Sequence, residues 1–337
     1  MAVSRDVNGV IDIKRKIVKN ILAMVTRVIF MGTPEFAVPS LEALIRSSYQ
    51  VVAVYTQPDR KAGRGQRMAS SPIKEMALSQ GLQVVQPETL KDSKATELLA
   101  SFDPDIIVVA AFGHILPLEI LALPKYGCLN IHPSLLPRYR GSSPIATAIL
   151  QGEEVTGVTI MLMDVGLDSG PILSQRTVSI SSEDTTGSLS GKLALTGAQL
   201  LMEILPLWFE RKIKPQPQDD SQASYTKVIA KGDGEVDWHL TASELWRRVR
   251  AFDPWPGCYT WWRGKRLKIL EVVPLPGEQS GAAGKVIALP QPAPVVVGVE
   301  TADGISGLLR VQLEGKQEMS AEEFVRGHRD FIGSLLV

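Results

Sequence analysis

The sequence has little cysteine, no net charge and no long apolar run. Its two cysteines, Cys128 and Cys258, belong to no Cys-x-x-Cys or Cys/His pattern, which argues against a disulfide scaffold or zinc site and favours a reducing compartment. Basic and acidic residues number 36 each, so any nucleic-acid-binding signal has to be local. Because no stretch approaches the roughly 20 apolar residues of a membrane-spanning helix, we expect a soluble, cytoplasmic protein.

The first 27 residues carry six basic and two acidic side chains ahead of the first predicted strand. They lack the small-residue cleavage pattern of a secretory signal, and two aspartates are unusual in an organelle presequence. We therefore expect residues 1–26 to be an extension without function, with Met24 as a plausible start. Organellar import stays open as the alternative.

Strand and helix patterns alternate through the first part of the chain. The strand patterns are at 27–32, 51–56, 82–87, 104–113, 127–132 and 157–166. The helical patterns are at 33–48, 71–81, 95–102 and 186–209. This alternation predicts an α/β domain over residues 27–209, with an open, mostly parallel sheet covered by helices on both faces.

A polar segment with two prolines, residues 210–225, follows the last of these helices and predicts a linker. Beyond it, in residues 226–337, a basic helix at 242–252 precedes short strands separated by Gly/Pro turns, which predicts a small β-barrel domain. The strand patterns of this second domain are at 266–273, 284–289, 294–300 and 307–314.

Asn130 and His132 end the strand pattern GCLNIH. Two positions apart in an extended strand, they share a face, and ligands of open α/β sheets bind at the carboxyl ends of strands. Asp168 lies in a glycine-flanked turn after the next strand, from which its carboxylate could reach the imidazole. An Asn/His pair can instead cap backbone groups, and an Asp in such a turn often serves only the turn. Taken together, the three residues predict a catalytic site.

Two stretches are locally basic. Residues 58–74 have a net charge of +4 on a glycine-containing loop, which suits phosphate groups, although a solvated surface loop is the alternative. Residues 246–270 have a net charge of +6 with Trp255, Trp261 and Trp262 interspersed, a profile typical of a nucleic-acid surface. The alternative places tryptophans in the barrel core, and we expect that of at least one.

Seven stretches, in order from about residue 27 to the end, resemble the methionyl-tRNA formyltransferase family. They are FMGTPEFAVPSLEAL, TQPDRKAGRGQRMASSPIK, AAFGHILP, NIHPSLLPRYRGSSPI, GVTIMLMDVGLDSGPIL, AFDPWPG and GKQEMSAEEFVRG. The resemblance implies a formyltransferase α/β domain followed by an oligonucleotide-binding-like (OB-like) barrel, in a monomer that needs no metal. It implies transfer of the formyl group of 10-formyltetrahydrofolate to the α-amine of methionyl initiator tRNA, giving N-formylmethionyl-tRNA for translation initiation.

The resemblance also implies roles for particular residues. The catalytic motif of the family falls on Asn130, His132 and Asp168. The implied folate contacts are Phe112, Gly113, Ile115, Ser134, Leu135, Leu136 and Pro137, where Leu135 and Leu136 could instead only pack their loop onto the core. The implied tRNA contacts are Arg60, Lys61, Arg64 and Arg67 in the first basic stretch, with Arg64 at the key arginine of the family, and Arg247, Arg248, Lys265 and Arg266 in the second.

Three other functions compete with this prediction. Formyl transfer to a small amine, on a nucleotide or an amino sugar, would need neither basic stretch, although Pro133 is a residue that nucleotide-directed relatives carry. An RNA-binding protein with a degenerate enzyme domain would not need Asn130, His132 and Asp168 intact. A nicotinamide dehydrogenase is excluded because GTPEFA, after the first strand, has one glycine where the fingerprint has three.

Overall fold

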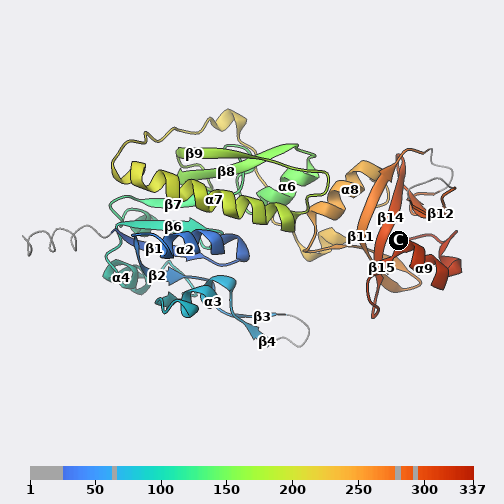
Figure 1. The fold of residues 1–337 in the computed structure, drawn as a ribbon, viewed down its shortest axis with the longest axis horizontal. Coiled ribbons are helices and arrows are strands. Elements are labelled where there is room, and N and C mark those ends of the chain that lie inside the picture. Colours follow the sequence, from blue (N-terminus) through green and yellow to red (C-terminus); the bar gives the residue numbers. More distant parts are fainter. Residues whose placement is uncertain (1–25, 63–66, 278–281, 291–294) are drawn as a thin grey trace, which may run out of the picture. The chain divides into compact units, whose positions relative to one another are not determined.

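The computed structural model describes residues 26–62, 67–277, 282–290 and 295–337 (Figure 1). The chain divides into two compact units, each made of several segments. The first contains the chain up to residue 132 together with 159–175 and 194–218, and the second contains 133–158, 176–193 and 219–337. The predicted bounds 27–209, 210–225 and 226–337 differ from this division and stay a prediction. Of the predicted extension, residues 1–25 lie outside the described residues.

A seven-stranded sheet carries the strands predicted for the α/β domain. In sheet order its strands are β5 (Val84–Val85), β2 (Gln50–Tyr55), β1 (Arg27–Gly32), β6 (Ile106–Ala110), β7 (Cys128–His132), β8 (Val155–Leu162) and β9 (Ile172–Ser179). Parallel pairing runs from β5 through to β7, whereas β7 pairs with β8 in antiparallel fashion. The predicted open, mostly parallel sheet is thereby confirmed.

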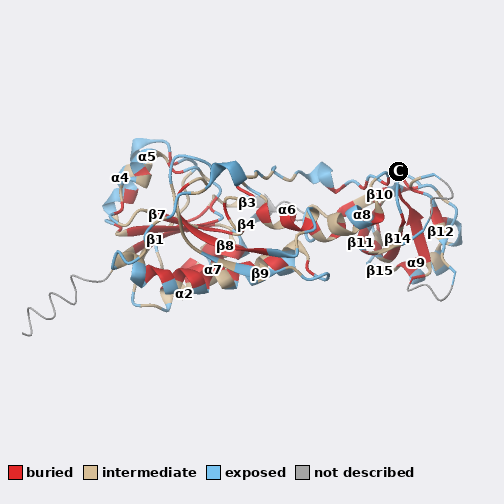
Figure 2. Ribbon diagram, turned by 90° about the horizontal axis from the view of Figure 1, so that it is seen from above, coloured by how far each residue is buried: buried red, intermediate tan, exposed pale blue. Residues whose placement is uncertain are grey.

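Helices cover both faces of this sheet. In Figure 2, α2 and α7 lie on one side of the buried strands and α4 and α5 on the other. All five residues of β6 are buried, as the continuous apolar run predicts for a strand covered on both faces. The helices of this region are η1 (Glu35–Ala37, a 3₁₀ helix), α2 (Val38–Ile45), α3 (Pro72–Ser79), α4 (Ser93–Ser101), α5 (Leu118–Leu121), α6 (Pro144–Leu150) and α7 (Thr186–Phe209).

The sequence also explains where helices start. Ser71 is the N-cap of α3, where its hydroxyl accepts a hydrogen bond from the backbone N–H of Lys74 at 3.0 Å, and Pro72 occupies the first helical position. Thr241 and Glu244 form a capping box at the start of α8 (Ala242–Ala251), the predicted basic helix.

Among the described residues, no helix is both long and apolar enough to cross a membrane.

An antiparallel sheet forms from the strands of the C-terminal region. Its path is β10 (Cys258–Trp262), β11 (Lys265–Leu275), β14 (Ile305–Leu313), β13 (Val297–Glu300) and β12 (Val286–Ala288), and β15 (Met319–Ser320) also pairs with β14. Residues 334–337 join the two end strands, because the N–H of Trp261 donates to the carbonyl of Val337 at 2.8 Å and the N–H of Leu336 to that of Gly284 at 2.9 Å. These bonds close the predicted OB-like barrel.

Shorter elements complete the description. The strands β3 (Arg60–Ala62) and β4 (Arg67–Ala69) form a separate hairpin in the first basic stretch. The remaining helices are α9 (Ala321–Gly327) and the 3₁₀ helices η2 (Asp220–Gln222), η3 (Lys231–Gly234) and η4 (Arg329–Phe331). The segment predicted as a linker is hydrogen-bonded in places, since Gln216 pairs with Ile172 through two backbone bonds of 2.8 and 2.9 Å.

Candidate active site

Strand β7 presents the first two residues of the predicted catalytic set. Its apolar residues are buried and fix the strand in the sheet, and Asn130 and His132 project together from one face. Asn130 lies opposite Val109 of β6, and His132 lies opposite Thr159 of β8. Asn130 is half-buried and His132 is only 4% exposed, so both side chains act in surroundings that largely exclude water.

Asp168 reaches these residues by an indirect route. Because β8 is antiparallel to β7, the end of β8 at Leu162 lies beside Leu129, at the start of β7. Residues 163–170 then carry Asp168 back to the other two side chains. The Asn130 amide Nδ2 donates to Asp168 Oδ1 at 3.3 Å, and His132 Nδ1 lies 3.7 Å from Asp168 Oδ2. The structure therefore brings together the amide, the imidazole and the carboxylate.

The turn that carries Asp168 is fixed by residues the sequence analysis did not select. Asp168 has a φ of +50°, a left-handed conformation that Asp tolerates better than most residues. The side-chain amide of Gln218 donates to the carbonyls of Asp168 at 2.8 Å and Gly170 at 2.7 Å. At Gly170 a Cβ would lie 1.9 Å from the Leu162 carbonyl oxygen, so only glycine fits. Gln218 lies in a polar segment without periodicity, so no pattern in the sequence indicated that its side chain would contact the Asp168 turn.

A cavity of about 470 Å³ lies on the same edge of the sheet, after strands β1, β2 and β6. Two hydrogen bonds hold its lining segments together: the Thr33 hydroxyl and the Gln57 side-chain amide each donate to the carbonyl oxygen of Phe112 at 3.1 Å. The lining residues are Thr33, Pro34, Gln57, Pro58, Arg60, Ala69, Ser70, Ser71, Pro72, Ala111, Phe112 and Gly113. Since β6 pairs with β7, this cavity lies at the carboxyl end of the strand next to the one that carries Asn130 and His132.

The residues predicted to contact folate differ in exposure. Gly113 is exposed and Ile115 is 79% exposed, so both are open to a ligand. Phe112, Ser134 and Leu136 are buried, and the Ser134 hydroxyl donates to the carbonyl of Arg138 at 2.7 Å. The side chains of these three residues serve packing and loop structure, and the carbonyl of Phe112 already accepts hydrogen bonds from Thr33 and Gln57.

Leu135 and Pro137 complete the predicted folate set, and both are half-buried. Leu135 packs against Gly157, where a Cβ would lie 2.5 Å from a Leu135 methyl carbon. Leu135 thus packs on a neighbouring residue and Leu136 is buried, while the alternative that both only pack their loop onto the core stays a prediction. The folate contacts themselves stay a prediction.

Among the residues predicted to contact tRNA, those of the first basic stretch are only partly described. Arg60 is exposed, and its guanidinium donates to the Gln57 side chain at 3.3 Å. Arg64 lies outside the described residues, as do the side chains of Lys61 and Arg67.

The predicted tRNA contacts of the second stretch differ in whether their side chains already contact other residues of the chain. The Arg247 guanidinium lies against Gly152, and the Arg248 guanidinium donates to the carbonyl of Asp233. Lys265 is exposed, and the Arg266 guanidinium lies 3.5 Å from the centre of the Tyr259 ring. Lys265 is therefore the one exposed side chain of these four, and Arg247, Arg248 and Arg266 are each half-buried against a neighbour.

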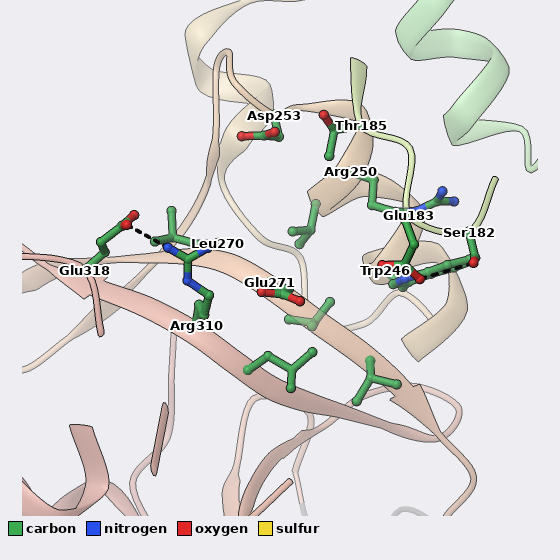
Figure 3. A pocket seen from close by; sticks show the side chains of 14 residues that line it. Ser182, Glu183, Thr185, Trp246, Arg250, Asp253, Leu270, Glu271, Arg310 and Glu318 are labelled. Atoms are coloured by element: carbon green, nitrogen blue, oxygen red, sulfur yellow. Dashed lines mark hydrogen bonds and ion pairs between the residues drawn. The ribbon is translucent and has the colours of Figure 1, made fainter. Parts of the chain in front are cut away.

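Another cavity, of about 360 Å³, lies within the second compact unit (Figure 3). Its walls come from residues 182–185, from α8 and from strands β11 and β14. Arg250 stacks on Trp246 at 3.8 Å from the ring centre, and Arg310 forms an ion pair with Glu318 at 2.6 Å. Its lining residues include no histidine and no side-chain amide, so it holds no amide–imidazole–carboxylate set.

Thiol and metal chemistry have no support among the described residues. Burial raises the pKa of both Cys128 and Cys258 to about 12, so neither is a thiolate at neutral pH. Within the described ranges no group of three or more His, Cys, Asp or Glu side chains is placed to hold a metal ion.

Comparisons with known proteins identify the family of the chain. Residues 26–205 match the family model for formyl transferase, and residues 228–329 match the model for its C-terminal domain. The methionyl-tRNA formyltransferase of Chloroflexus aggregans is 46% identical over 89% of this chain and 97% of the relative. That of Methylococcus capsulatus is 45% identical over 90% of this chain and 97% of the relative.

Solved structures share the fold at lower identity. An N-formyltransferase from Helicobacter canadensis, in complex with folinic acid and dTDP-3-aminofucose, is 21% identical with a TM-score of 0.59, over 88% of this chain and all of that one. HypX from Aquifex aeolicus, in complex with tetrahydrofolic acid, is 20% identical with a TM-score of 0.57, and 89% of this chain matches about half (47%) of that longer chain. From the two family models and the close relatives together, we conclude that the chain belongs to the methionyl-tRNA formyltransferase family.

Proposed function

We propose that this protein transfers the formyl group of 10-formyltetrahydrofolate to the α-amine of methionyl initiator tRNA. The observation that carries the proposal is the cluster of Asn130, His132 and Asp168 at the same edge of the sheet as the cavity of about 470 Å³. Attack of the amine on the formyl carbon converts its carbonyl oxygen into an oxyanion, and loss of an amine proton and departure of the folate nitrogen complete the transfer. The protein has to stabilise that oxyanion and move that proton.

Asn130 supplies a fixed hydrogen-bond donor. Its side-chain amide has two N–H groups, and one of them is directed to Asp168 Oδ1. This bond fixes the rotation of the amide, so that the second N–H has a set direction in which to meet the oxyanion. A donor that is oriented in advance stabilises developing charge without reorganisation during the reaction.

His132 and Asp168 handle the proton. Asp168 Oδ2 faces Nδ1 of the imidazole, and we assign Nε2 to the contact with the substrate. When His132 is protonated, the nearby carboxylate stabilises the imidazolium, and the low exposure of both groups strengthens this attraction relative to water. His132 can then donate a hydrogen bond to the oxyanion and give its proton to the departing folate nitrogen. The neutral imidazole then takes up the proton that the amine loses, while Asp168 keeps the ring in position.

In this proposal the folate and the tRNA contact different sets of residues. The folate contacts Gly113 and Ile115 and the backbone of Phe112, together with Ser134, Leu135, Leu136 and Pro137. The tRNA contacts Arg60, Lys61, Arg64 and Arg67 near its acceptor end, and Arg247, Arg248, Lys265 and Arg266 in the C-terminal region. We place the reaction in the cytoplasm of a bacterial-type cell, and the protein acts as a monomer.

One face of the β10–β11 hairpin supports the RNA contact. Tyr259 lies opposite Lys268, and Trp261 opposite Arg266, so two aromatic and two cationic side chains share one face. The alternation of β10 buries Cys258, Thr260 and Trp262 on the other face. Aromatic rings interleaved with cations suit bases and phosphates of RNA.

Formyl transfer to an amino sugar is the second candidate function. It is favoured by the structural likeness to the Helicobacter canadensis enzyme, which was solved with dTDP-3-aminofucose. The identity to that enzyme is 21%, against 46% to a methionyl-tRNA formyltransferase, so the tRNA substrate has the stronger support.

A direct assay separates the two candidates. The purified protein is incubated with 10-formyltetrahydrofolate carrying a labelled formyl group and either charged initiator tRNA or an amino sugar nucleotide. We expect the label on the methionyl-tRNA alone, with uncharged initiator tRNA as the control that lacks the amine. Label that appears only on the amino sugar nucleotide would contradict the proposal.

A further inference from the structure

The chain leaves the candidate active site through an irregular loop. Residues 133–141 begin directly after His132 and contain the predicted folate contacts 134–137. Tyr139 has a φ of +61°, a left-handed conformation that is strained for a bulky residue, and Gly141 has a φ of +106°. Such a backbone persists only where surrounding residues hold it.

Residues 219–226, mostly within the segment predicted as a linker, hold the end of this loop. The backbone N–H of Tyr139 donates to the hydroxyl of Ser224 at 2.9 Å, and the backbone N–H of Arg140 donates to the carbonyl of Ser224 at 2.8 Å. In return, the N–H of Thr226 donates to the carbonyl of Arg140 at 2.8 Å. A Cβ at Gly141 would lie 2.9 Å from the Thr226 hydroxyl, so the two backbones approach closely.

Arg140 extends this contact through its side chain. The side chain is 2% exposed, although it carries a full charge. Its guanidinium donates to Asp220 Oδ1 at 2.7 Å and to the Tyr225 hydroxyl at 3.2 Å. A buried guanidinium is costly unless its donors are satisfied, so the loop takes the position in which Arg140 meets these partners.

A separate contact holds the middle of the loop. The Tyr139 hydroxyl donates to Glu153 Oε1 at 2.6 Å, and Arg138 forms an ion pair with the same carboxylate. Glu153 therefore anchors the strained residue, while residues 219–226 anchor the residues after it. The loop is fixed from two directions before any substrate binds.

We propose that Arg140 is a positioning residue, which acts through Asp220 and Tyr225 to hold loop 133–141 in the shape that binds the formyl donor. The inference rests on the proposed function and deepens it. The geometry assigns to residues 219–226 a part in donor binding, in addition to the part as a linker that the sequence predicts for most of them.

The test removes the partners of Arg140 and leaves Arg140 itself in place. Asp220→Asn and Tyr225→Phe change side chains that are 81% and 63% exposed, so each variant is expected to fold. The matched control is Glu322→Gln, which weakens an exposed ion pair to Arg326 on α9. The KM for 10-formyltetrahydrofolate, the KM for methionyl-tRNA, kcat and the melting temperature are measured for each variant.

We expect Asp220→Asn to raise the KM for the donor by about tenfold, because it replaces the charged acceptor of Arg140 with a neutral one and so weakens this hydrogen bond. The KM for methionyl-tRNA and the melting temperature are expected to stay close to those of the parent and of Glu322→Gln. Asp220→Glu is expected to restore most of the donor affinity. An unchanged donor KM in the double variant of Asp220→Asn and Tyr225→Phe would overturn the proposal, as would equal changes in both KM values.

Binding of 5-formyltetrahydrofolate, measured by calorimetry, keeps the two proposals distinguishable. If the parent protein does not formylate methionyl-tRNA, the proposed function fails. Weaker binding of this folate by the variants than by the parent would still support the positioning role of Arg140, and equal binding would overturn it.

Discussion

At the scale of single residues, the environment distinguishes two His–Asp pairs in this chain. His132 and Asp168 have side chains that are 5% and 15% exposed, whereas His239 and Asp237 are 84% and 60% exposed. The exposed pair is closer, with Nδ1 3.0 Å from the carboxylate against 3.7 Å. Water screens the exposed pair, so its shorter distance does not make it reactive. His132 is suited to chemistry because it is buried and because the Asn130 amide lies beside it.

His132→Ala and Asp168→Ala are each expected to slow formyl transfer strongly. The loss of one donor to an oxyanion typically costs on the order of 10²- to 10³-fold in rate. Single-turnover measurements with bound methionyl-tRNA report the chemical step, and a filter-binding assay is expected to show unchanged tRNA affinity. His239→Ala is the matched control, with a rate close to that of the parent. Near-normal single-turnover rates in the two active-site variants would remove these residues from the mechanism.

At the scale of elements, the start of the long helix α7 depends on one buried carboxylate. Asp184 accepts hydrogen bonds from Ser181, Ser188 and Lys192, with its contacts to the Ser188 hydroxyl and the Lys192 ammonium both at 2.7 Å. Burial alone would raise the pKa of Asp184, but these hydrogen bonds outweigh it and lower the pKa to about 2. The folded protein therefore favours the ionised form.

Asp184→Asn is expected to reduce the free energy of unfolding by about 2 kcal/mol at neutral pH, through loss of charged hydrogen bonds. Because the pKa is lower in the folded chain than the ordinary value of 3.8, this stabilisation is complete above pH 3.8 and is lost as the pH falls to about 2. Denaturant unfolding across that range measures the difference, with Glu183→Gln, an exposed neighbour, as the control. A difference that persists undiminished at pH 2 would contradict this account.

At the scale of the whole molecule, two stretches of a neutral chain carry a local excess of basic residues. Equal numbers of acidic and basic residues give a net charge of zero, while residues 58–74 and 246–270 have net charges of +4 and +6. Local charge of this kind can bind phosphates without making the protein a general polycation.

We expect the affinity for initiator tRNA to fall steeply with salt. If the eight predicted arginine and lysine contacts each meet a phosphate, the loss between roughly 50 and 200 mM salt is on the order of 10⁴-fold. Lys265→Gln is expected to reduce the slope of log affinity against log salt by about 1. Lys316→Gln, at an exposed position outside both basic stretches, is the control and should leave the slope unchanged. A flat salt response would remove the basic stretches from tRNA binding.

Periodicity predicted the elements that lie in continuous patterns. The helix at 186–209 and the strand at 27–32 match α7 and β1, because both form from long or fully apolar runs. The strand β9 was missed, since its alternating half-buried residues include Gln175 and Arg176 and resemble a polar loop. The terminal residues 334–337 were missed because only their pairing with β10 and with residues near β12 makes them part of the barrel.

The sequence by itself determined the family, the order of elements and the identity of the three candidate catalytic residues, because local patterns and motifs are properties of neighbouring positions. Only the tertiary structure decided how Asp168 returns from the far end of β8, that Gln218 holds its turn, and that Arg140 is buried between Asp220 and Tyr225. Those contacts join positions 38 to 85 residues apart. Their geometry follows from chain packing, which no local pattern encodes.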